Sequence, residues 1–234
     1  MTEFRPGRFQ ILPTVIKNLL IINGLVFLAQ NVFGDRLGFS LNDVFALHTF
    51  QSPLFKPWQF ITHMFMHGSL AHIFGNMLAL WMFGAVLENL WGPKRFLIFY
   101  IVCGLGAALC HMIVLYVETH NLLQQYNALG YAEQQAYRDR VFAIIDEPTL
   151  GASGAVFGCL AAFGYLFPNT YIYLYFLFPI KAKWFVIMYA AFELLTAIQN
   201  SAGDNVAHVA HLGGALVGFI LVYFWNKNNR RNFY

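Results

Sequence analysis

The chain has 234 residues, of which 59% are hydrophobic, 18% are aromatic and only 11% are charged. Soluble domains average roughly 45–50% apolar and about 25% charged residues, so these charges are too few to cover a water-soluble domain. The 25 Phe, 12 Tyr and 5 Trp also exclude a disordered chain, and the net charge of +3, without a basic and aromatic cluster, excludes a nucleic-acid partner. The composition therefore predicts a polytopic helical membrane protein whose surroundings are the lipid bilayer.

Six apolar stretches are long enough to cross the hydrocarbon of a bilayer, which takes about 20 helical residues. They run in chain order over 14–33, 70–90, 94–117, 150–167, 183–199 and 206–225. Between them, 35–59 is expected to be a partly embedded loop, and the polar segment 121–148 a solvent-exposed one. The strip 171–180 is too short to cross and is expected at the membrane interface. The sequence shows no repeat or linker, so we expect an all-α, six-helix bundle forming one domain over 1–234.

The positions of Lys and Arg orient this bundle. With the N-terminus inside, only four of the fourteen basic residues lie in outer segments: Arg36, Lys56, Arg138 and Arg140. Cytoplasmic loops carry the excess of positive charge in membrane proteins. The sequence therefore predicts a multi-pass protein with cytoplasmic N- and C-termini, in the plasma (inner) membrane if the source is bacterial.

Polar residues stand near the beginning of the second, fourth and sixth spans, all of which run from outside to inside. They are His72 and Asn76, Ser153, and the pair His208 and His211. At about 1.5 Å per residue, a position five to seven residues into a helix lies about 8–10 Å below its mouth. Polar side chains inside spans are costly and are functional candidates by default. We therefore expect one shallow layer of Ser, His and Asn side chains on the outer side.

Small residues on two spans predict that their backbones approach closely. Glycines four apart occur in the fourth and sixth spans, at Gly154, Gly158, Gly214 and Gly218. Such faces allow close helix contact in lipid. Since each face lies beside a nucleophile or base candidate, the pairing predicts that Ser153 and His211 lie within hydrogen-bond range.

These residues resemble the rhomboid intramembrane serine proteases over most of the chain from about Trp58 onward. The resemblance is carried by Gly-Ala-Ser-Gly at 151–154, Ala-His-Leu-Gly-Gly at 210–214, and a His-x3-His-x4-His-x3-Asn pattern over 63–76. It implies a serine endopeptidase without a cofactor, acting on transmembrane segments of other proteins near their outer ends. It also implies that Ser153 is the nucleophile, His211 the general base, and His72 with Asn76 the oxyanion site.

The chemistry of these residue types agrees with that reading. Serine is a weak nucleophile until a base takes its proton, and histidine titrates near neutrality. Apart from Asp204, no carboxylate is close to His211 along the chain, so we expect a Ser–His dyad whose imidazole is oriented by helix packing. His72 and Asn76 are four apart and share a helix face, so both can donate to a developing oxyanion. The role of Glu193 stays open between packing and gating.

Several neighbouring residues carry weaker expectations. Phe157 replaces the Tyr that the resemblance leads us to expect, so stacking on His211 should survive without a hydroxyl contact. Gln59 stands where some relatives have Arg, which puts an ion pair anchoring the first loop in doubt. Structural hydrogen bonds are expected for the remaining polar residues: His63 and His67 in the first loop, His208 to a loop or backbone partner, and Glu88 to the second loop.

Two other functions fit parts of the pattern. His63, His67, His72, His208 and His211 form a ligand-like set, as in a membrane metalloenzyme. Against this, the chain has no HExxH motif and no adjacent His pair. A rhomboid-like protein that binds membrane clients without cutting them is the other alternative, although such proteins lack the Ser or the His. A transporter is disfavoured by the absence of an inverted repeat.

Overall fold

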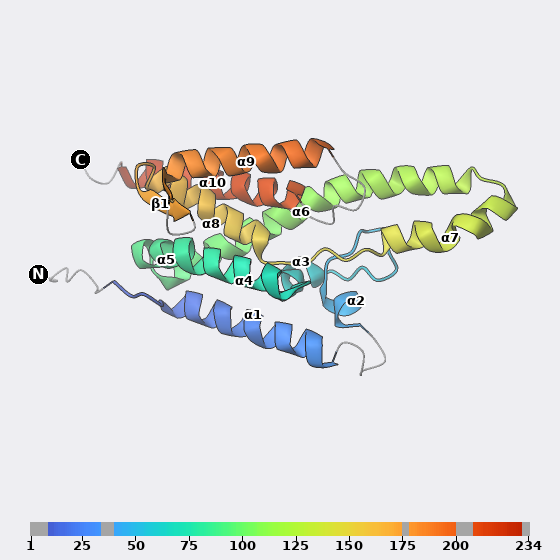
Figure 1. Ribbon diagram of the computed structural model, residues 1–234, viewed down its shortest axis with the longest axis horizontal. Coiled ribbons are helices and arrows are strands. Elements are labelled where there is room, and N and C mark those ends of the chain that lie inside the picture. Colours follow the sequence, from blue (N-terminus) through green and yellow to red (C-terminus); the bar gives the residue numbers. More distant parts are fainter. Residues whose placement is uncertain (1–8, 34–39, 175–177, 200–207, 231–234) are drawn as a thin grey trace, which may run out of the picture.

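The computed structural model describes residues 9–33, 40–174, 178–199 and 208–230 as a bundle of long helices lying side by side (Figure 1). The helices are α1 (Thr14–Phe33), α2 (Leu41–Phe45), α3 (Gln59–Thr62), η1 (His63–Phe65), α4 (Leu70–Ala79), η2 (Leu80–Gly84), α5 (Ala85–Trp91), α6 (Pro93–Asn127), α7 (Tyr131–Ile145), α8 (Ser153–Leu166), α9 (Ala182–Gln199) and α10 (His208–Arg230). The six expected spans correspond to α1, the continuous α4–η2–α5 segment, α6, α8, α9 and α10.

Four helical stretches of the described chain are long and apolar enough to cross a membrane: Thr14–Phe33, Leu70–Trp91, Pro93–Asn127 and His208–Lys227. α8 is also apolar but has only 14 residues, and α9 has 18. The side chains from Gly154 to Gly164 of α8 are all buried, as expected for a helix that is hydrophobic on every side. The chain is an all-α, multi-pass membrane bundle with its shortest span at the centre.

α8 and α10 pack with their backbones in direct contact, as the paired glycines predicted. A Cβ placed on Gly214 would overlap the carbonyl group of Gly154, and a Cβ on Gly218 would lie 2.6 Å from the carbonyl oxygen of Gly158. Neither position has room for a larger side chain. The two helices carrying Ser153 and His211 are therefore held together by backbone contact.

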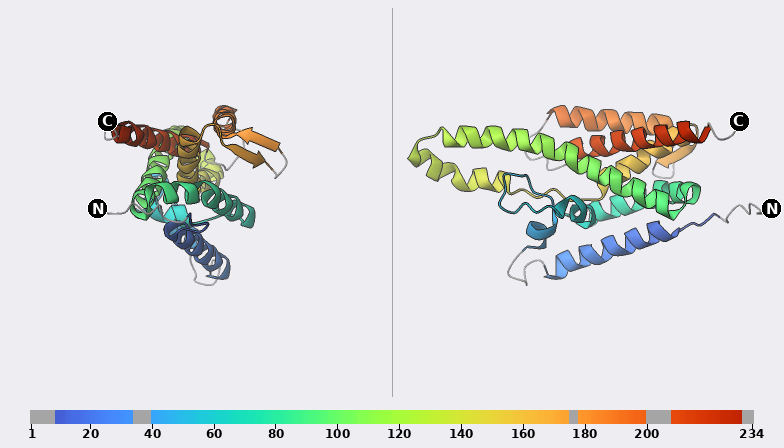
Figure 2. Two further views of the ribbon diagram at one scale, coloured as in Figure 1. Left: turned by 90° about the vertical axis from the view of Figure 1, so that its left-hand side faces the viewer. Right: turned by 180° about the vertical axis from the view of Figure 1, so that it is seen from behind.

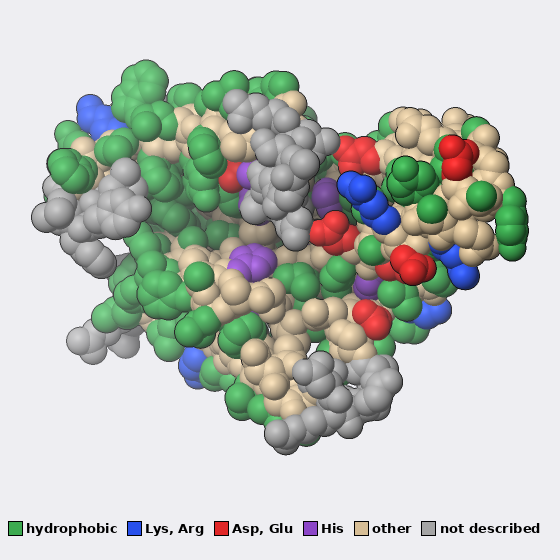
Figure 3. All heavy atoms as spheres, turned by 45° about the vertical axis from the view of Figure 1, so that its right-hand side comes forward, with side chains coloured by type: hydrophobic (Ala, Val, Ile, Leu, Met, Phe, Trp, Pro, Cys, Tyr) green, Lys and Arg blue, Asp and Glu red, His purple; other side chains and the backbone are tan. Residues whose placement is uncertain are grey.

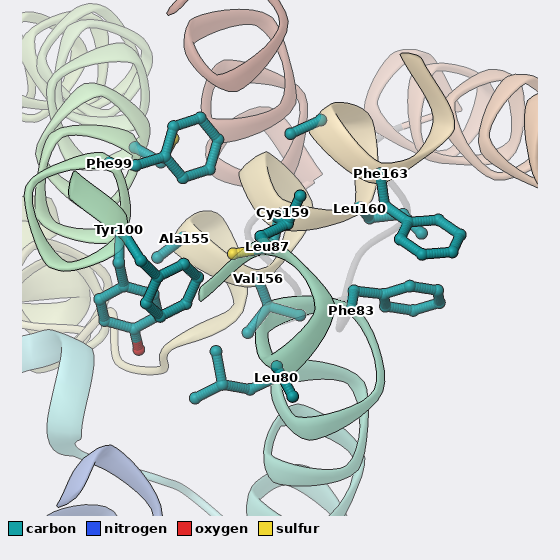
Figure 4. Packing of buried hydrophobic residues seen from close by; sticks show 14 of the residues in the cluster. Leu80, Phe83, Leu87, Phe99, Tyr100, Ala155, Val156, Cys159, Leu160 and Phe163 are labelled. Atoms are coloured by element: carbon teal, nitrogen blue, oxygen red, sulfur yellow. The ribbon is translucent and has the colours of Figure 1, made fainter. Parts of the chain in front are cut away.

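The hydrophobic core packs side chains of η2, α5, α6 and α10 around α8. Figure 4 shows Phe83 of η2 beside Phe163 of α8, and Leu80, Leu87 and Val156 belong to the same cluster. The Phe83 and Phe163 rings meet edge to face, with centroids 5.2 Å apart. This packing fixes the position of α4 relative to α8, and with it the distance between His72 and Ser153.

Two connections differ from expectation. The 121–148 segment is exposed as predicted, but it is not a loop, because α6 continues to Asn127 and α7 returns beside it as a helical hairpin (Figures 1 and 2). The side chain of Glu133 accepts the Gly130 N–H at the start of α7, which stabilises this turn.

The strip 171–180 contains an antiparallel pair, β1 (Tyr171–Leu174) and β2 (Phe178–Lys181), because alternating aromatic and β-branched residues favour strands.

The first loop is organised around Gln59, which is fully buried. Its amide nitrogen lies within hydrogen-bond distance of three backbone carbonyls, and its amide oxygen accepts two backbone N–H groups. The partners are Asp43, Val44 and Leu54 for the nitrogen, and His48 and Lys56 for the oxygen. A neutral amide therefore anchors the loop in place of the ion pair that Arg would make.

Glu88 connects the second span to the first, and the predicted tie to the second loop is wrong. Its two carboxylate oxygens accept the backbone N–H groups of Val15 and Ile16, each at 2.9 Å. The first N–H groups of a helix have no partner within the helix, and a negative charge there also complements the helix dipole. The buried Glu88 carboxylate therefore caps the N-terminus of α1.

We expect Glu88→Ala to lower the thermal unfolding temperature of the detergent-solubilised protein. Each buried N–H left without an acceptor costs about 1–3 kcal/mol. Glu88→Gln keeps one acceptor oxygen, so its unfolding temperature should lie between those of the alanine variant and the wild type. Equal unfolding temperatures for all three proteins would contradict this role.

Candidate active site

The Ser153 side chain stands on the first residue of α8, directly after a tight turn. Gly151 in this turn has φ +132°, which residues with a side chain rarely adopt. Its N–H donates to the His63 carbonyl at 2.9 Å, which ties the turn to the first loop. A Cβ at Gly151 would also lie 2.8 Å from His72 Nε2 and 3.6 Å from Ser153 Oγ. Glycine thus lets the His72 ring approach the serine.

His211 on α10 meets Ser153 as predicted. Its Nε2 lies 2.9 Å from Ser153 Oγ. The Phe157 ring stacks on the imidazole with centroids 4.3 Å apart and planes 6° from parallel, which confirms the stacking expected without a tyrosine hydroxyl. Phe157 is one turn below Ser153 on α8, so the helix that carries the serine also supports the histidine.

His72 and Asn76 lie on α4 and line the same cavity as Ser153 and His211. The Asn76 side chain is buried, and its Nδ2 has no hydrogen-bond partner among the described residues. An unsatisfied buried donor costs about 1–3 kcal/mol, so such groups call for an explanation. Asn76 therefore brings an unpartnered N–H donor to the cavity that Ser153 also lines.

The cavity has a volume of about 1060 Å³ and extends from these residues toward the α6–α7 hairpin. Its walls at that end include Glu118, Leu122 and Ile144. Figure 3 shows histidine side chains exposed between the bundle, which is covered by hydrophobic side chains, and the hairpin side, where acidic and basic side chains gather. The cavity therefore joins the site to the polar hairpin side of the molecule.

The side chains of His63 and His67 were both predicted to form structural hydrogen bonds, and the described contacts show such a bond for His63 alone of the two. His63 Nδ1 lies 2.8 Å from the Gln59 carbonyl oxygen, so its structural hydrogen bond is confirmed. The His67 ring has no hydrogen-bond partner among the described residues and packs edge-on against His72, so the predicted hydrogen bond of the His67 side chain is wrong. The backbone N–H and carbonyl of His67 pair with the Gln30 side chain instead. Burial lowers the pKa of both His63 and His67 to about 4, so both rings are neutral at pH 7.

The expectation that no carboxylate orients His211 is wrong. Glu193 on α9 places Oε2 3.0 Å from His211 Nδ1. The same oxygen lies 2.6 Å from His208 Nδ1, which is also 3.1 Å from Thr196 Oγ1. His208 therefore has side-chain partners on α9 that the sequence did not predict, and the predicted loop or backbone partner stays a prediction. The sequence feature that could have indicated this contact is Glu193 itself, a lone acidic residue inside an apolar span. Asp204 and the rest of 200–207 lie outside the described residues.

The five-histidine metal set is not assembled. Among the described residues, the group that offers three possible ligand atoms within 4.8 Å of one another is Glu193, His208 and His211. His63, His67 and His72, which the metalloenzyme alternative also needs, do not belong to it. The three grouped side chains are already joined by hydrogen bonds, which accounts for their proximity without a metal.

Comparison with known proteins agrees with this architecture. The family model described as "Rhomboid domain" matches residues 54–228. The chain is 30% identical over 207 residues to RHOMBOID-like protein 12, mitochondrial, of Arabidopsis thaliana, covering 88% of this chain and 56% of that protein. It is 31% identical over 168 residues to Rhomboid protein 1, mitochondrial, of Saccharomyces cerevisiae, covering 70% and 40%.

A bacterial relative matches at similar length. Rhomboid protease AarA of Providencia stuartii is 28% identical over 216 residues, covering 87% of this chain and 69% of that protein. The chain spans about half the length of the first two relatives. The matched family domain covers α3 through most of α10, including His72, Asn76, Ser153, Glu193 and His211. The chain belongs to the rhomboid family.

Proposed function

We propose that this protein is an intramembrane serine endopeptidase, and the observation that carries the proposal is the 2.9 Å approach of His211 Nε2 to Ser153 Oγ. In the first step His211 takes the hydroxyl proton while Oγ bonds to the scissile carbonyl carbon, whose π electrons move to its oxygen. The carbonyl then re-forms as the C–N bond breaks, and the protonated imidazole gives its proton to the leaving amine, which releases the first product and leaves an acyl-enzyme. Water then attacks the acyl-enzyme in the same way, with His211 as base, and frees the second product together with the Ser153 hydroxyl.

The oxyanion formed in this step has three candidate donors: the His72 ring, the Asn76 amide and the Ser153 backbone N–H. Ser153 is the first residue of α8, where N–H groups have no partner within the helix and the dipole favours negative charge. Donors fixed before the reaction stabilise the developing charge without reorganisation. The unpartnered Asn76 Nδ2 supports this assignment.

Asn76→Ala is expected to lower kcat by about 10²–10³-fold, the usual effect of removing one oxyanion donor. KM should change little, because the interaction forms in the transition state. The unfolding temperature should not fall, because Asn76 Nδ2 makes no hydrogen bond within the described chain. Steady-state kinetics with a fluorogenic transmembrane substrate measures both constants, and an unchanged kcat would remove Asn76 from the oxyanion site.

The substrates in this proposal are transmembrane segments of other proteins, cut near their outer ends. A helix has its carbonyls hydrogen-bonded, so a segment must unwind locally before Ser153 can attack it. α4, α8 and α10 all begin at the end of the bundle opposite to the beginning of α1 (Figure 1). With the termini cytoplasmic, as the basic residues favour, the site opens toward the outer face.

The function is tested with detergent-solubilised protein, a model transmembrane substrate and a fluorophosphonate probe. We expect product formation that the probe blocks, with mass spectrometry placing the label on Ser153. Binding of the substrate without cleavage or labelling would instead indicate a client-binding protein. Stoichiometric zinc or iron in the purified protein, with cleavage abolished by a chelator, would indicate a metalloenzyme.

A further inference from the structure

Three ionisable or nucleophilic side chains from three helices lie in one row. Ser153 Oγ on α8 is 2.9 Å from His211 Nε2 on α10, and His211 Nδ1 is 3.0 Å from Glu193 Oε2 on α9. Glu193 is 3% exposed and His211 is 9% exposed. The two imidazole nitrogens therefore face different partners, the hydroxyl on one side and the carboxylate on the other.

This arrangement selects the tautomer of His211. An ionised carboxylate only accepts hydrogen bonds, so the contact at 3.0 Å requires the proton on Nδ1. Nε2 of the neutral ring then carries a lone pair directed at Ser153 Oγ, which is the state that a general base needs. With the proton on Nε2 instead, the ring has no lone pair to offer the serine.

The carboxylate also compensates for charge during the reaction. His211 becomes an imidazolium when it takes the serine proton, and it lies in a bundle where an uncompensated buried charge is costly. Glu193 keeps its negative charge throughout, and the proton stays on the imidazole until the leaving amine receives it. Attraction between the carboxylate and the imidazolium therefore grows as the transition state forms, which lowers the barrier.

We propose that Glu193 is a positioning residue that fixes the reactive tautomer of His211, so that the site works as a Ser–His–Glu triad. The inference rests on the proposed peptidase function and adds a third member to it. Glu193 reaches the site from α9, whose sequence gives no sign of which side chains face α10.

The contact of Glu193 with His208 provides the main alternative explanation, in which the carboxylate has only a structural role. Its Nδ1 lies 2.6 Å from Glu193 Oε2, so Glu193 also joins α9 to the beginning of α10. A residue that served only this connection would affect stability and substrate binding. It would leave the tautomer of His211 and the rate of the chemical step unchanged, and this difference separates the two roles.

The experiment compares wild type with Glu193→Gln, which has the same shape without the charge, and with the matched control Glu133→Gln on exposed α7. Glu193→Gln is expected to lower kcat by about 10²–10⁴-fold, within the range known for removing the carboxylate of a triad. KM should change by no more than about threefold, because ground-state binding does not use this contact. The rate of fluorophosphonate labelling at Ser153 should fall with kcat, and Glu133→Gln should match wild type.

A spectroscopic measurement keeps the test independent of stability. In protein labelled with 15N-histidine, the two ring nitrogens of His211 have distinct shifts for each tautomer, and His211→Gln identifies its signals. We expect the Nδ1–H form in wild type and a mixed or Nε2–H form in Glu193→Gln. An unchanged tautomer together with unchanged kcat would overturn the triad while leaving the peptidase intact. A wild-type protein that neither cleaves nor labels would instead refute the proposed function itself.

Discussion

Ser153→Ala is expected to lower kcat for cleavage of a transmembrane segment by about 10⁶-fold, the scale observed when a serine protease loses its nucleophile. The variant lacks the oxygen that forms the acyl bond, while the cavity and the oxyanion donors remain. Product should therefore fall below detection in a gel assay that follows the wild-type reaction to completion.

The matched variants for this prediction are His211→Ala and the double replacement. Nucleophile and base act as one unit, so the double variant should be no slower than either single variant. Ser153→Ala should bind the substrate as wild type does and should retain its unfolding temperature within the error of the measurement. Cleavage that persists in Ser153→Ala would exclude the serine mechanism.

Gly214→Val is expected to lower both kcat and the unfolding temperature, although residue 214 is not one of the reacting groups. A Cβ at this position would overlap the Gly154 carbonyl, so α10 must move away from α8. The same movement withdraws His211 from Ser153, and a displacement of about 1 Å at a reacting group costs about 10²-fold in rate. We expect at least that loss in kcat, together with a lower unfolding temperature.

Gly24→Val on α1 is the control for this substitution. A Cβ at Gly24 has no neighbour within 4 Å, so the same chemical change meets open space. Its kcat and unfolding temperature should stay close to the wild-type values. If Gly214→Val also behaved as wild type, then close contact between α8 and α10 would not be required for the alignment of the site.

Much of the fold follows from local properties of the sequence. Apolar length predicted the helices that form the spans, and the glycine spacing predicted the contact of α8 with α10. The same glycine faces predicted that Ser153 and His211 meet, and the structure shows their side-chain atoms 2.9 Å apart. The helical form of the 121–148 segment was missed because its polar composition was read as a loop, although a polar surface does not prevent a helix.

Long-range polar contacts were not predictable in the same way. The contact of Glu193 with His211 depends on how α9 is rotated about its axis, which its nearly uniform apolar sequence does not define. Glu88 likewise accepts N–H groups from residues more than seventy positions earlier. In both cases a buried carboxylate in an apolar span was visible in the sequence, and only its partner was not.

The length of α6 has a consequence for the size of the proteins that reach the active site. Its 35 residues, at about 1.5 Å each, give a rod of about 52 Å, whereas the hydrocarbon core of a bilayer is only about 30 Å thick. The excess emerges beside the cavity mouth, with α7 folded back along it. In the proposed reaction, a folded domain placed directly at the scissile bond would collide with this projection, so we expect preferred substrates to carry a stretch of unstructured polypeptide there.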